Sequence, residues 1–143
     1  EAEIDDVFVL RRVLEVGAVR VAAGRELSSA DRAALFRALE ESAAADVPDY
    51  RRLDSRLHLL IAELTGSRSL VQAMADMRTR VNRVLDSIPV LPPNLAHSNE
   101  QHAEIVSAIL AGRPDAAAEA MLAHVEGSEA LMRGFHATRS HRD

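Results

Sequence analysis

Several residue types that mark particular protein classes are missing or rare in this 143-residue chain. It has no cysteine, which excludes disulfides and thiolate metal sites and fits a reducing cytoplasm. Tryptophan is absent and aromatic residues make up only 3%, so the core must be built from aliphatic side chains. No apolar run reaches the roughly 18 residues of a membrane helix, and no secretory leader pattern is visible. We therefore expect a cytoplasmic protein that does not contact membranes.

Positive charge is also in short supply. Lys and Arg number 17 against 22 Asp and Glu, which gives a net charge of −5, and the arginines are scattered along the chain. A domain that holds nucleic-acid phosphates normally carries a basic patch. We therefore do not expect this chain to bind DNA by itself. It begins with Glu1 rather than Met, and from this we expect it to be part of a longer protein.

The residues that are abundant favour helices. Ala, Leu, Arg and Glu dominate, β-branched alternation is nearly absent, and the few glycines and prolines separate periodic segments. Ser28 and Asp31 form a capping-box pattern at the start of the second segment. The chain is thus predicted to be all-α, an antiparallel bundle of about six helices in one domain over residues 1–135. The predicted helices cover about 4–23, 28–46, 48–66, 67–86, 98–111 and 114–135, with a proline-rich loop at 87–97 and a flexible tail at 136–143.

Four polar side chains fall on the apolar faces of three predicted helices. At 100° per residue, Asp54 and His58 share a face with Ile61 on the third helix. His102 lies on the apolar stripe of the fifth helix, and His124 lies on that of the sixth. These four side chains are therefore predicted to point into the core of the bundle.

Burying such groups without partners is unfavourable. An unpaired buried carboxylate costs several kcal/mol, and an unsatisfied imidazole costs roughly 1–3 kcal/mol. A divalent cation would remove both penalties, and the i, i+4 spacing of Asp54 and His58 places both side chains beside one ion. The pattern leaves two interpretations open, a metal site and a buried Asp–His network. His97, His136 and His141 fall in the predicted loop and tail, and we interpret them as surface residues.

Two arginines also fall on inward faces. Arg11 lies on the apolar stripe of the first helix, where it either contacts a bound anion or forms an i, i+4 ion pair with Glu15. Arg78 lies on the stripe of the fourth helix without an obvious acidic partner, and Asn82 lies at the edge of that stripe. An inward guanidinium of this kind indicates an anion-binding cavity. The alternative is an arginine that extends along its stem to solvent.

Taken in order, these motifs resemble the FCD domain, the C-terminal effector-binding domain of the FadR branch of GntR-type bacterial transcription regulators. The resemblance runs from about Val7 to Met132, and it departs from the family at Ser67, where an Asn is frequent. The segments that carry it are RRVLEVGAVRVAA with Arg11 and Glu15, LDSRLHLLIAELTG with Asp54 and His58, HAEIVSAILAG with His102, and AAAEAMLAHVEGSEALM with His124.

The resemblance implies a helical bundle around a cavity, a homodimer, and an N-terminal winged-helix domain, absent from this chain, through which the regulator binds DNA. It implies a divalent metal, for which we expect Zn²⁺ with Ni²⁺, Mn²⁺ or Fe²⁺ as alternatives, held by Asp54, His58, His102 and His124. It also implies a small carboxylate metabolite as effector, bound beside the metal. From their positions, we expect the contacts of that effector to be Arg11, Arg78 and Asn82.

Two other functions fit the same residues. A metal-dependent hydrolase would use the same ligands, although Glu63 and Glu104 are predicted to point outward and leave no clear general base. A structural bundle without any ligand would bury the same polar network. Turnover of a ligand would distinguish the enzyme from the sensor, and metal content would distinguish the structural bundle from both.

Overall fold

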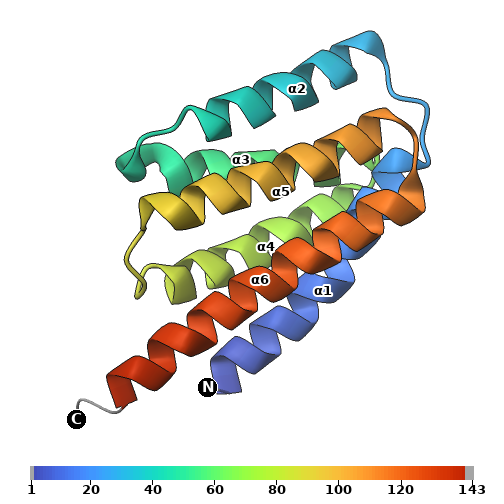
Figure 1. The fold of residues 1–143 in the computed structure, drawn as a ribbon. Helices are drawn as coiled ribbons and strands as arrows, with labels where there is room; N and C mark the ends of the chain where they lie inside the picture. Colours follow the sequence, from blue (N-terminus) through green and yellow to red (C-terminus); the bar gives the residue numbers. More distant parts are fainter. Residues whose placement is uncertain (1, 141–143) are drawn as a thin grey trace.

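The computed structural model describes residues 2–140, which form six α-helices and no strand. The prediction of an all-α bundle is confirmed, and no helix in the described part is both long and apolar enough to span a membrane. The start of α1 and the end of α6 lie at the same end of the bundle (Figure 1). The helices are α1 (Ala2–Ala23), α2 (Ser29–Ala43), α3 (Val47–Leu64), α4 (Arg68–Leu85), α5 (Pro92–Leu110) and α6 (Pro114–Ser140).

Local sequence signals set several helix ends. The predicted capping box is present, because Ser28 Oγ accepts from the Asp31 amide at 3.0 Å and Asp31 Oδ2 accepts from the Ser28 amide at 3.3 Å. Gly66 and Gly112 follow α3 and α5 with φ of +76° and +65°. Glycine reaches this left-handed conformation without the steric penalty of a side chain, so these two positions end their helices.

Two predicted boundaries were wrong. Residues 92–97 were predicted to be loop, but α5 begins at Pro92. Pro92 and Pro93 occupy its first turn, where the missing amide hydrogen breaks no helical hydrogen bond. The sixth helix continues to Ser140 rather than ending near Phe135, because neither glycine nor proline interrupts the segment that follows. His141 lies outside the described residues.

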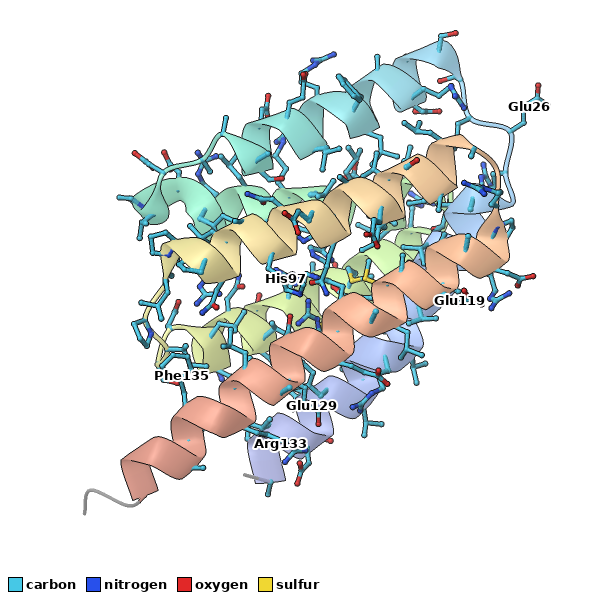
Figure 2. All side chains as sticks on the ribbon, in the orientation of Figure 1. Glu26, His97, Glu119, Glu129, Arg133 and Phe135 are labelled. Atoms are coloured by element: carbon cyan, nitrogen blue, oxygen red, sulfur yellow. The ribbon has the colours of Figure 1, made fainter. Side chains whose placement is uncertain are left out.

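The first helix contacts most of the other helices. Helix α1 packs against α3, α4, α5 and α6, whereas α2 packs on α3 and α5 and lies at the edge (Figure 1). Ion pairs fasten α1 to α6 in antiparallel register, with Arg12 bound to Glu129 and Asp5 bound to Arg133. Figure 2 shows Glu129 and Arg133 on the part of α6 that borders α1. The polar residues predicted to point inward therefore come from the five helices that surround one point.

Candidate metal and effector site

The four predicted metal ligands meet inside the bundle. Asp54 and His58 come from α3, His102 from α5 and His124 from α6, and all four are buried. One ligand atom from each lies within 4.8 Å of all the others. Asp54 Oδ1 is 3.3 Å from His102 Nε2 and 3.5 Å from His58 Nε2. The inward orientation predicted from periodicity is confirmed, and this group of side chains could hold one metal ion.

The spacing of the imidazole nitrogens fits a shared ion. His102 Nε2 and His124 Nε2 lie 3.2 Å apart. Nitrogen ligands about 2.1 Å from one ion are separated by roughly 3.0–3.4 Å at octahedral or tetrahedral angles. His58 is buried, and neither of its ring nitrogens makes a hydrogen bond of good geometry within the described residues. A cation at the centre of the cluster would bind the lone pair of His58 Nε2, which faces Asp54, and remove the cost of leaving that nitrogen unpaired.

Gln101 orients His124 for metal binding. His124 Nδ1 lies 2.9 Å from Gln101 Oε1, which can only accept a hydrogen bond. The proton is therefore assigned to Nδ1, so Nε2 keeps its lone pair on the side that faces His102 Nε2. Hydrogen bonds of this kind to the outer nitrogen orient metal-binding histidines in proteins.

Arg78 is not the free guanidinium that the sequence suggested. It donates to Asp54 Oδ2 and lies 3.5 Å from Glu15 Oε1 through Nη1. The premise that it lacks an acidic partner was wrong, because face analysis within one helix does not reveal which residue of a neighbouring helix stands opposite. Asp54 thus has one oxygen bound to Arg78, and its other oxygen faces the histidines.

Glu15 occupies the junction of α1, α3 and α4. Its Oε2 accepts from Arg11 Nε at 2.7 Å, and its Oε1 lies 2.9 Å from His58 Nδ1. The i, i+4 pair of Arg11 and Glu15, one of the two alternatives for Arg11, is therefore present and buried. Burial would raise the pKa of Glu15, but the charges of Arg11, His58 and Arg78 outweigh it and hold the pKa well below its ordinary value.

Burial and neighbouring charges also set the pKa values of the other buried titratable groups. Burial would raise the pKa of Asp54, but Arg78 and His58 hold it well below its ordinary value. Burial lowers the pKa of His102, and burial together with the neighbouring positive charges lowers that of His124 strongly. Burial would also lower the pKa of His58, but Glu15 raises it. Asp54 is therefore ionised and His102 and His124 are neutral near pH 7, the forms in which these groups bind metals.

A cavity of about 200 Å³ reaches this cluster from one side. Asp54, His124 and Arg11 line its inner end, whereas His58 and His102 do not line it. Arg11 Nη2 lies 3.5 Å from His124 Nε2, and Nη1 is buried without a hydrogen-bond partner among the described groups. The other lining residues come from the end of α4, from the segment after it and from α3, α5 and α6. The apolar wall is formed by Leu85, Ile88, Val90, Leu91, Leu95 and Leu131.

The predicted effector contacts separate in the structure. Arg11 lines the cavity, but Arg78 and Asn82 do not. Asn82 is half-buried and donates to Ser55 Oγ at 2.9 Å. Both residues belong to α4, and their role as effector contacts stays a prediction. His97 is exposed, as predicted, and His136 is half-buried.

Sequence reasoning missed polar residues that line the cavity. Tyr50 donates to Ser98 Oγ at 2.9 Å, and Arg51 donates to Leu85 O at 2.9 Å. Burial, together with the charge of Asp54, raises the pKa of Tyr50 to about 12, so it is a neutral donor. The i, i+4 spacing of Tyr50 and Asp54 was a signal from which Tyr50 could have been predicted as a site residue. Gln101 is half-buried and beside the stripe of α5 rather than on it, so periodicity gave no signal for it.

Comparison with known proteins identifies related regulators. The chain is 28% identical over 134 residues to the "Putative L-lactate dehydrogenase operon regulatory protein" of Escherichia coli (strain K12), and equally to the protein of that name from Shigella flexneri. Each match covers 91% of this chain and 52% of the relative, so the chain spans about half the length of these proteins.

Two solved structures share the fold. E. coli McbR/YncC matches with a TM-score of 0.84 at 18% identity, over 95% of this chain and 66% of that one. The metal-free FCD domain of TM0439 matches with a TM-score of 0.67 at 19% identity, over 96% of this chain and 93% of that one. A family model of the FCD domain matches residues 6–127, and this chain therefore belongs to the FCD domain family.

Proposed function

We propose that this chain is the ligand-sensing domain of a GntR/FadR-type transcription regulator. In this proposal it binds one divalent metal and one small carboxylate metabolite, and the metabolite controls DNA binding by a winged-helix domain elsewhere in the protein. Membership of the FCD family and relatives named as regulatory proteins support the proposal. The observation that carries it is the convergence of four buried ligand atoms, two of them from side chains, Asp54 and His124, that line a cavity together with Arg11.

The metal part of the proposal assigns Asp54, His58, His102 and His124 as ligands. One oxygen and three nitrogens suit Zn²⁺ first, with Ni²⁺, Mn²⁺ and Fe²⁺ as alternatives. When bound, the ion would supply a positive charge that attracts a carboxylate and accepts its oxygen. Arg78 supports this site indirectly, because it holds the outer oxygen of Asp54 and leaves the inner one free.

The effector part rests on the charge of the inner end of the cavity. Arg11 lines this end and has one buried nitrogen without a hydrogen-bond partner among the described groups, and a buried guanidinium hydrogen without an acceptor is costly. A carboxylate that meets both the metal and Arg11 would remove this cost, and the apolar wall would receive the carbon skeleton. A cavity of about 200 Å³ favours a small metabolite. A 2-hydroxy acid deserves inclusion among the test ligands, because two relatives are named for an L-lactate dehydrogenase operon.

Transmission to DNA would use α1. This helix carries Arg11 and packs against four of the other five described helices, so a ligand that shifts Arg11 acts on a helix that contacts most of the bundle. A ligand can change DNA binding only by its difference in affinity for the two arrangements of the protein. We propose that the full regulator acts as a homodimer and that this chain alone leaves operator DNA unbound, in line with its negative charge.

An enzymatic role receives less support. A hydrolase needs a general base that faces the ligand. Asp54 is the one carboxylate among the described residues that line the cavity, and it is a proposed metal ligand. Glu63 and Glu104 are exposed, and Glu15 lies outside the cavity wall. We propose a sensor, from which the ligand is recovered unchanged.

Calorimetric titration of the metal-loaded chain tests the function. The panel should contain 2-hydroxy acids, 2-oxo acids, dicarboxylates, sugar acids and the corresponding uncharged amides. We expect at least one acid to bind, its amide to bind much more weakly, and the acid to be recovered intact after incubation. Binding of amides alone would remove the carboxylate proposal, and steady conversion of a ligand would favour the enzyme.

A further inference from the structure

The acidic side chain of Glu15 lies behind the histidines, outside the cavity, and is almost completely buried. It has three close partners on three helices. Arg11 donates to Oε2 at 2.7 Å, Arg78 Nη1 is 3.5 Å from Oε1, and His58 Nδ1 is 2.9 Å from Oε1. Arg11 and Arg78 therefore donate to the two carboxylate oxygens, and His58 Nδ1 faces Oε1 at a short distance but without the N–H alignment of a full hydrogen bond.

We propose that Glu15 is a positioning residue for the metal site, which keeps the proton of His58 on Nδ1 and so leaves the lone pair of Nε2 facing Asp54. This inference rests on the proposed metal site, and it adds a residue outside the four proposed ligands. A carboxylate can only accept hydrogen bonds, so Glu15, 2.9 Å from Nδ1, favours hydrogen on that nitrogen more strongly than Asp54, 3.5 Å from Nε2, favours hydrogen on the other. Gln101 does the same for His124 through its amide oxygen.

The alternative role for Glu15 is charge balance alone. Four buried charged groups meet here, the guanidinium groups of Arg11 and Arg78 and the carboxylates of Glu15 and Asp54. In that case any acceptor that compensates the arginines would serve, and the tautomer of His58 would not depend on Glu15. The two roles predict different results for a glutamine at position 15.

Substitution Glu15→Gln distinguishes proton positioning from charge balance, because an amide and a carboxylate form different hydrogen bonds. An amide has one accepting oxygen and one donating nitrogen. Arg11 and Arg78 can only donate, whereas the neutral ring of His58 can also accept. The amide nitrogen is therefore expected to turn toward His58, which places the ring proton on Nε2 and directs it at the metal position. The residue keeps nearly the same volume, so the change is in proton placement and charge rather than packing.

The first measurement is zinc affinity of the chelator-stripped chain, by competition with a chromophoric chelator. Loss of a partner behind a metal-binding histidine typically weakens metal binding by about 10- to 100-fold, and we expect this range for Glu15→Gln. The matched control is Glu129→Gln, an acid on α6 that is also largely buried and binds Arg12 and Arg133 but no histidine. It should bind zinc as the unsubstituted chain does.

The second measurement is the tautomer of His58, from ring ¹⁵N shifts in NMR of the metal-free chain, assigned with His58→Ala and recorded at a pH where the ring is neutral, because Glu15 raises its pKa. We expect Nδ1–H in the unsubstituted chain and in Glu15→Asp, which keeps a group that can only accept, and Nε2–H in Glu15→Gln. Unchanged zinc affinity in Glu15→Gln, or weaker affinity with an unchanged tautomer, would overturn the inference.

The design also covers failure of folding and failure of the metal proposal. If Glu15→Gln does not fold, the tautomer of the unsubstituted chain decides, and Nε2–H there overturns the inference. If the unsubstituted chain binds no metal, the proposed function fails in its metal part. The same tautomer measurement then still tests whether Glu15 sets the proton position on His58.

Discussion

Gln101 Oε1 lies 2.9 Å from His124 Nδ1, so a side chain on α5 sets which nitrogen of a histidine on α6 is free to bind. The same glutamine lines the cavity, so it contacts both the histidine cluster and the space proposed for the effector. Removing its oxygen would release the ring of His124 and let the proton occupy either nitrogen.

Substitution Gln101→Leu should therefore weaken zinc binding by about 10-fold or more. Leucine fills similar space but accepts no hydrogen bond, so the expected loss comes from the orientation and tautomer of His124. Zinc titration of the chelator-stripped chain measures it. The control is Gln72→Leu, an exposed glutamine on α4 that binds Asp76 and belongs neither to the cluster nor to the cavity wall. Equal zinc affinity in both variants would show that Gln101 does not orient His124.

Effector binding should depend on Arg11 and not on its neighbour Arg12. Truncating one partner of a charge-assisted contact in a desolvated site costs about 2–5 kcal/mol, so Arg11→Ala should weaken carboxylate binding at least tenfold. Arg12→Ala is the control, because Arg12 binds Glu129 and does not line the cavity. Calorimetry of the metal-loaded variants gives the comparison, with metal content measured in parallel. Equal losses in the two variants would mean that the ligand binds elsewhere.

Arg78 should affect stability and metal binding instead. Substitution Arg78→Met leaves the buried carboxylates of Asp54 and Glu15 without one of their partners. Breaking a buried pair from one side typically costs about 3–5 kcal/mol, and the protonation that follows would also weaken Asp54 as a ligand. Urea unfolding of the metal-free chain tests the first effect. A loss below 1 kcal/mol would contradict the buried network described here.

Stability of the metal-free chain should be greatest near pH 6.5–7, around the ordinary histidine pKa of about 6.5. Burial lowers the pKa of His102 and His124. On acidification below about pH 6.5 the unfolded chain therefore takes up protons before the folded chain does, and stability falls. His58 acts oppositely, because Glu15 raises its pKa against the effect of burial. Its contribution is present below about pH 6.5 and is lost as the pH rises through its folded value.

Thermal unfolding in chelator from pH 5 to 8.5 checks this dependence. Each kcal/mol lost should lower Tm by roughly 3–4 °C for a domain of this size. The depressed pKa values of Asp54 and Glu15 add a further loss at lower pH, since their contributions disappear only as the pH falls through their folded values. A Tm that rises steadily from pH 7 to pH 5 would contradict the shifts of His102 and His124.

The parts of the site that lie on regular helix faces were predictable from sequence. A 100° rotation per residue was enough to place Asp54, His58, His102 and His124 inward, and the structure confirms all four orientations. Pairing between helices was not predictable in this way. Arg78 meets Asp54 only because of the rotation and offset of α4 against α3, which periodicity within one helix does not define.

The start of α5 was a different kind of error. A segment with three prolines was predicted to be loop, but two of them stand together in a first turn, where proline is tolerated. The true connection is shorter and ends in Leu91, which lines the cavity. Residue counts alone placed the start of α5 about six residues too late. The prediction therefore misplaced a boundary on which the wall of the proposed effector site depends.

The most direct test of the proposed metal site is the zinc stoichiometry of the chelator-stripped chain and of variants in which one histidine is replaced by alanine. The proposed metal site predicts about one ion per chain, a strong loss in both His58→Ala and His102→Ala, and no loss in His97→Ala, which removes an exposed histidine of the cavity wall. It also predicts that zinc raises Tm in the unsubstituted chain, because an ion bound to the folded state stabilises it. Full zinc occupancy in His58→Ala and His102→Ala would contradict the account.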